Sequence, residues 1–155
     1  METNVATPAA TPSGAQGQAH GTFEVTLHAL APYHDAEDAM LGRRSIDKQF
    51  RGDLEGTSRG EMLSAGTPVQ GSAAYVAIEH VTGTLHGRRG TFVLQHAATM
   101  TRGAPHLVIT VVPDSGTGAL AGLTGAMTIE IAAGQHAYAF AYALPDALPD
   151  VFPDA

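Results

Sequence analysis

Glu79 and His96 are the side chains whose types and predicted placement could do acid–base chemistry. A carboxylate beside an imidazole can move protons near neutral pH. Strand alternation puts both on one apolar face, with Tyr75, Val81, Leu85, Phe92, Leu94 and Met100. Two ionisable groups in such a layer indicate either a functional acid/base pair or a buried pair that fixes strand register. An odd-length turn or a bulge would instead put His80 opposite His96.

A predicted β-hairpin brings the two groups together. Residues 73–85 and 91–100 are typical of strands, and the polar linker 86–89 is turn-like. If Leu85 pairs with Gly90, the carboxylate and the imidazole lie directly opposite each other.

The following strand supports this assignment of faces. We expect residues 106–112 to form a strand in which Met100 pairs with Pro105. This register puts three further apolar side chains on the face that carries the pair: Leu107, Ile109 and Val111. A one-residue slip would send the whole set to the other face.

Composition bounds the class of protein. The chain has 155 residues, no cysteine and a formal charge of −7. This length suits one domain, and the charge argues against a nucleic-acid-binding surface. There is no apolar run long enough for a membrane span and no signal-peptide pattern. We therefore expect a cytoplasmic protein without disulfides.

Low-complexity ends flank the predicted domain. Residues 1–19 are rich in Ala, Thr, Pro, Gly and Gln and predict a disordered tail. Residues 145–155 repeat a Pro-Asp theme and predict an extended acidic tail, with Leu148 or Phe152 available to lie on the body. The domain is expected at residues 20–144.

Within this domain, short alternating stretches predict antiparallel strands. Besides the three above, they are 22–27, 45–51, 55–65, 125–133 and 136–144. Gly52-Asp53 is interpreted as a bulge or bend within one longer strand, and residues 35–41 as a single helical turn. Glycines punctuate residues 113–125, where Gly116-x-Gly118 indicates a turn rather than a nucleotide-binding loop. About eight strands with short turns predict a closed all-β barrel, because closure removes exposed edges.

Several runs resemble a family of small bacterial proteins with an allene-oxide-cyclase-like β-barrel. They are 50–58, 75–85, 92–96 and 111–125, and the resemblance covers residues 21–144. It implies a fold that is similar to plant allene oxide cyclases, dirigent proteins and some natural-product cyclases, which steer a reactive small molecule inside an apolar cavity. The catalytic residues of the plant cyclases do not transfer by motif, and any role played by a cysteine there is vacant here.

Further side chains are candidates for a substrate-binding wall. Tyr75, Phe92 and Met100 share the face of the acid/base pair. Glu61 is either a second interior carboxylate or a solvated strand residue. Tyr138 and Tyr142 share the large face of the last hairpin, where they either line a cavity or serve as core aromatics.

The remaining patterns exclude some chemistries and suggest a partner. Eight histidines show no metal-ligand spacing, and the acidic loop near His34 is interpreted as hydrated, so neither a metal nor a cofactor is expected. The last hairpin also carries a small apolar face, made of Ala132, Ala137, Ala139, Ala141 and Ala143. It indicates a homodimer contact or, if the aromatic face points outward, the inside of a crowded barrel.

These observations favour a cofactor-independent isomerase, cyclase or lyase. An apolar substrate would lie in the barrel, with Glu79 and His96 moving a proton. The alternatives are a small-ligand-binding barrel without chemistry and a filled structural barrel.

Overall fold

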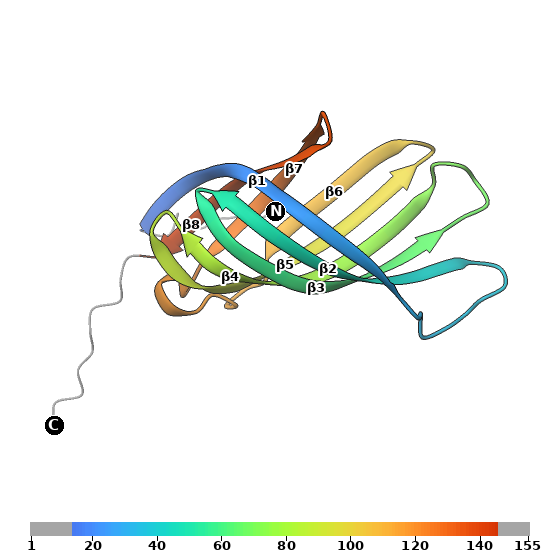
Figure 1. Cartoon of the computed structure of the whole chain (residues 1–155), viewed down its shortest axis with the longest axis horizontal. Helices are drawn as coiled ribbons and strands as arrows, with labels where there is room; N and C mark the ends of the chain where they lie inside the picture. Colours follow the sequence, from blue (N-terminus) through green and yellow to red (C-terminus); the bar gives the residue numbers. More distant parts are fainter. Residues whose placement is uncertain (1–13, 146–155) are drawn as a thin grey trace, which may run out of the picture.

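The protein, seen here as a computed structural model that describes residues 14–145, is a closed antiparallel β-barrel (Figure 1). Within that range its strands are β1 (Gly14–Leu30), β2 (Met40–Gly52), β3 (Leu54–Gly66), β4 (Ala73–Leu85), β5 (Arg88–Thr101), β6 (Ala104–Val111), β7 (Thr124–Ala132) and β8 (Gln135–Pro145). Each pairs with its sequence neighbour, and β1 pairs with β8 to close the sheet. The predicted all-β barrel is confirmed.

The N-terminal boundary of the domain differs from the prediction. β1 begins at Gly14, so the end of the expected disordered tail is a strand. Gly14 pairs with Pro145 and Ala19 with Phe140, and Ala19 is buried. Backbone pairing with β8 orders a segment whose sequence lacks apolar alternation. The other parts of both predicted tails, with Leu148 and Phe152, lie outside the described residues.

Two local predictions on the β1–β3 part of the chain are wrong. Gly52-Asp53 is the turn between the separate strands β2 and β3, not a bulge or bend within one longer strand. Gly52 has a φ of 109°. Two hydrogen bonds join Asp53 to the backbone of His20: Asp53 N donates to His20 O (3.1 Å), and His20 N donates to Asp53 Oδ2 (2.8 Å). Residues 35–41 form no helical turn, and β2 begins at Met40.

The β4–β5 hairpin pairs two residues away from the predicted register. Leu85 pairs with Arg88, because the turn is His86-Gly87 alone, with φ of 45° and 80°. Such two-residue turns with positive φ match the twist of a hairpin. Glu79 therefore faces Leu94 rather than His96. A two-residue shift keeps every side chain on its predicted face.

The other face assignments hold. Met100 pairs with Pro105 as predicted, so β6 presents the expected apolar residues inward. The aromatic face of β8 points into the barrel, with Tyr138, Phe140 and Tyr142 buried, and the alanine face therefore points outward.

One end of the barrel is closed by packing. The connection between β6 and β7 contains a short 3₁₀ helix (Gly118–Leu120) and lies at the end where β8 finishes (Figure 1). Leu120 and Leu123 are fully buried in a core with Phe92, Phe140 and Leu54. The barrel interior is filled at this end, so a cavity inside the barrel must lie toward the other end. We call the filled end the solid end.

A glycine lets β3 approach β4 at mid-barrel. A Cβ at Gly60 would lie 2.1 Å from Ile78 O and 2.8 Å from Glu79 Cα. At Gly42 on β2, a Cβ would meet only the Ser64 hydroxyl, at 2.7 Å, which can rotate away.

We predict that Gly60→Ala lowers the free energy of unfolding by about 1–3 kcal/mol, because backbone atoms must move. Gly42→Ala is the matched control and should change it by less than about 0.5 kcal/mol. Urea unfolding of both variants checks this. Equal losses in the two variants would contradict the backbone clash.

Candidate functional site

A layer of four polar side chains crosses the middle of the barrel. Glu79 lies at its centre, fully buried, and accepts hydrogen bonds from Lys48 Nζ (3.1 Å), His96 Nε2 (2.7 Å) and Ser58 Oγ (2.5 Å). All three donors are themselves buried. The predicted Glu79–His96 contact is thus present, although it runs diagonally across the strands. We call Lys48, Ser58, Glu79 and His96 the polar layer.

Lys48 supplies the positive charge that the sequence analysis did not assign. Its alternation with Ile46 and Phe50 on β2 sends the ammonium inward. There Nζ lies 4.6 Å from the centre of the Phe23 ring, a distance suited to a cation–π contact. Glu79 and Lys48 together bring no net charge into the interior, which offsets much of the cost of burying them.

The polar layer keeps Glu79 ionised. Burial by itself would raise the pKa of the Glu79 carboxyl. The hydrogen bond from His96, the charge of Lys48 and the hydrogen bond from Ser58 outweigh burial and lower this pKa from 4.5 to about 2. A carboxylate of that pKa is a weak proton acceptor at neutral pH. Its geometry suits holding His96 in one orientation, with Nε2 as the protonated nitrogen.

A cavity of about 570 Å³ occupies the barrel mouth, on the far side of the polar layer from the solid end. Its inward-facing lining is mainly apolar, and it includes two predicted residues, Tyr75 and Met100. The other lining side chains that face inward are Arg44, Met62, Ser64, Ala73, Ala98, Pro105, Leu107 and Ile131. We call this space the mouth cavity.

Tyr75 connects the mouth cavity to the polar layer. Its ring centre lies 6.3 Å from that of His96. Burial, and then the charge of Glu79, raise the pKa of the Tyr75 hydroxyl, so it stays a neutral donor. Within residues 14–145 this hydroxyl has no hydrogen-bond partner, although every fully buried polar side-chain atom there has one. The Tyr75 hydroxyl therefore faces the open space of the cavity.

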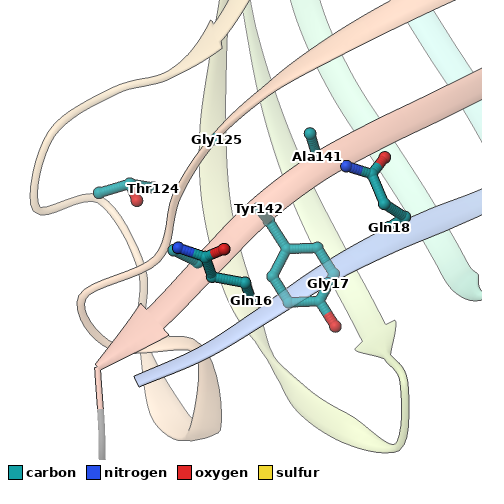
Figure 2. A pocket seen from close by; sticks show the side chains of 8 residues that line it. Gln16, Gly17, Gln18, Thr124, Gly125, Ala141 and Tyr142 are labelled. Atoms are coloured by element: carbon teal, nitrogen blue, oxygen red, sulfur yellow. The ribbon is translucent and has the colours of Figure 1, made fainter. Parts of the chain in front are cut away.

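A second hollow, of about 440 Å³, lies on another part of the barrel (Figure 2). Gln16 and Gln18 of β1 border it, together with Ala141 and Tyr142 of β8. The Tyr142 hydroxyl is taken up by His86 Nδ1, at 2.5 Å. Among the residues that the structure describes, its border includes no charged side chain and no member of the polar layer.

Comparison with known proteins identifies the family of this chain. Residues 19–142 match a family model described as protein of unknown function (DUF3224). The chain belongs to the DUF3224 family. It is similar to a DUF3224 protein with unknown function from Shewanella oneidensis MR-1, whose crystal structure is 50% identical with a TM-score of 0.79, over 83% of this chain and 96% of that one. None of the curated proteins matches the chain.

The DUF3224 match spans the polar layer and the mouth cavity together. Family membership and the barrel agree with the resemblance seen in the sequence, whereas the likeness to allene oxide cyclases stays a prediction. Over residues 14–145, no helix has the length and apolar character needed to cross a membrane. No three His, Cys, Asp or Glu side chains in that part of the chain are grouped as a metal ion would require.

Four residues predicted as substrate-binding lie outside the mouth cavity of this DUF3224 barrel. Phe92 stacks on Phe140 in the solid end, with ring centres 5.9 Å apart. The Tyr138 hydroxyl accepts from Leu54 N (2.9 Å), and Tyr142 bonds His86, so both tyrosines are core aromatics. Of the two alternatives for Glu61, the structure has the solvated strand residue, because Glu61 points outward and pairs with Arg43. Face alternation alone does not say at which height of the barrel a residue lies.

Arg44 and Ser64 are the inward-facing polar residues of the cavity that were not predicted from the sequence. A signal was available, because Arg44 has the same parity as Ile46 and Lys48 on β2. Ser64 has the parity of Ser58 on β3. An arginine at an inward strand position is the kind of polar exception that marks a site.

The charge of Glu79 yields a stability prediction. Glu79→Gln should lower the free energy of unfolding at pH 7 by about 3–5 kcal/mol, because Lys48 is left as an unpaired buried charge. The double variant Lys48→Met with Glu79→Gln should recover most of that loss. Chemical denaturation at pH 7 measures both effects, and an unchanged midpoint in Glu79→Gln would contradict the proposed role of the pair.

The stability difference between the wild type and Glu79→Gln should depend on pH. The folded pKa of Glu79, about 2, lies below its ordinary 4.5, so its contribution is complete above pH 4.5 and lost as pH falls toward 2. The gap between the wild type and Glu79→Gln should therefore narrow over that window.

Proposed function

We propose that the protein binds a small, mainly apolar molecule in the mouth cavity. The observation that carries this is a mainly apolar cavity of about 570 Å³, lined by the half-buried Tyr75, whose hydroxyl has no partner among the described residues and faces the open space. Its volume falls within the roughly 300–1,000 Å³ of small-molecule sites. A few unpaired polar groups on an apolar wall would orient a ligand.

The construction of the barrel supports binding rather than complete filling. The solid end holds most of the large buried side chains, among them Phe50, Phe92 and Phe140. Toward the mouth, Ala73 and Ala98 occupy inward positions, where larger side chains would fill the space. Each side chain of the polar layer between the two regions is hydrogen-bonded to another member of the layer, so the layer would form a rigid floor.

Ala98→Phe tests this proposal, because it places a ring inside the mouth cavity. We expect the affinity for N-phenyl-1-naphthylamine, a neutral apolar fluorescent probe, to fall by about tenfold or more. Ala97→Phe is the matched control, since Ala97 is the neighbouring residue of β5 on the outward face. Fluorescence titration gives both dissociation constants. Tight binding that survives Ala98→Phe, or no binding to the wild type, would contradict the proposal.

A cofactor-independent isomerase or cyclase is the second candidate, and the position of Tyr75 favours it. Its hydroxyl faces the cavity while its ring lies near His96, which Glu79 orients. Tyr75 would donate a hydrogen bond to a substrate carbonyl. The His96 nitrogen that is not bonded to Glu79 would take a proton from the substrate carbon next to that carbonyl. It would return the proton to another carbon of the substrate. The resemblance to allene oxide cyclases seen in the sequence is a further reason to propose this enzyme function.

The enzyme candidate predicts turnover that depends on one hydroxyl. The wild type should accelerate the conversion of 3-cyclohexen-1-one to its conjugated isomer, and Tyr75→Phe should reduce this by about 10²-fold. Tyr33→Phe, in an exposed loop, is the control. Ultraviolet absorbance follows the conversion, while probe affinity shows whether the site remains intact. Probe binding without any acceleration would leave a binding protein.

Two further properties are proposed for the protein. The outward alanine face of β8 suits a homodimer contact, because small side chains allow two sheets to approach closely. The absence of cysteine suits a cytoplasmic location.

A further inference from the structure

We infer that the ligand of the mouth cavity carries a single carboxylate, which pairs with Arg44. This inference rests on the proposed binding function and specifies its ligand class. It depends on how charge and hydrogen-bond donors are distributed over the cavity wall.

Arg44 is the lining residue that carries a permanent charge. Asp and Glu are absent from the described residues that line the cavity. The adjacent Arg43 points outward and pairs with Glu61, and Lys48 forms an ion pair with Glu79. No ion pair to Arg44 exists within residues 14–145. Its positive charge is therefore available to a bound molecule.

The neighbours of Arg44 add donors on the same wall. Ser64 pairs directly with Tyr75 across β3 and β4, so their side chains lie side by side on the inward face. Arg44 pairs with Met62, which places it diagonally from Ser64. Side chains in such diagonal positions are within reach of one another when one is long. Arg44, Ser64 and Tyr75 therefore occupy neighbouring inward positions on β2, β3 and β4.

The rest of the wall is apolar. Inward positions on β5, β6 and β7 present Ala98, Met100, Leu107 and Ile131 to the same space. A ligand that matches both parts has an apolar body and one compact polar end. A carboxylate fits that end, because its two oxygens accept the parallel N–H groups of one guanidinium. One fixed positive charge also balances one negative charge.

The test compares two probes of the same shape, 2-naphthoate and the neutral 2-acetylnaphthalene. Wild-type protein at pH 7.5 should bind 2-naphthoate about tenfold more tightly or better, as expected for a charge-assisted hydrogen bond. Arg44→Met should abolish this preference, and Arg43→Met, the outward-facing neighbour, should retain it. Calorimetric titration measures the dissociation constants.

Each outcome decides one question. Equal affinity of the wild type for the two probes would overturn the carboxylate inference and leave the binding function standing. Failure of both probes and of N-phenyl-1-naphthylamine would overturn the binding function itself. A preference that persists in Arg44→Met, or that Arg43→Met removes equally, would also overturn the assignment to Arg44. If Arg44→Met does not fold, Arg44→Gln takes its place, and the wild-type preference should weaken as salt is raised.

Discussion

The arrangement of this barrel depends on one ionised carboxylate in its middle, that of Glu79. Burying Glu79 without partners would cost more than a domain of this size can spare. Its partners come from β2, β3 and β5, while Glu79 itself is on β4. All four strands must therefore keep their relative positions for the charge to be satisfied. Polar groups that need specific partners restrict register in a way that interchangeable aliphatic side chains do not.

This constraint divides the interior into two regions with different roles. On one side of the polar layer, aromatic and leucine side chains fill the barrel, and the segment after β6 adds Leu120 and Leu123. On the other side, small inward residues leave the mouth cavity. The polar layer makes the division stable, because apolar side chains from the solid end cannot move past hydrogen-bonded charges to fill the cavity.

The sequence predicted correctly which face of the sheet a side chain occupies, but not the level along the barrel axis at which it lies. Alternation placed Glu79 and His96 inward, and it did so despite the wrong register, since the error was two residues. The turn could have been recognised: His86-Gly87 has the same X-Gly form as Arg102-Gly103, and both pairs adopt positive φ. Lys48 could not be joined to Glu79 in the same way. Their contact depends on barrel curvature across β3, which no pairwise pattern in the sequence encodes.

The mouth cavity also owes its shape to an unequal closure of the barrel. In the described chain, β6 and β7 pair at two positions, through Ile109 and Thr110, whereas β4 and β5 pair along their whole length. Beyond those two pairs, Leu107 and Ile131 face the cavity from strands that are not hydrogen-bonded to each other there. The polar wall on β2, β3 and β4 is held by continuous ladders. A rigid wall bearing the donors and a less constrained apolar wall suit a ligand recognised at one end and accommodated along its length.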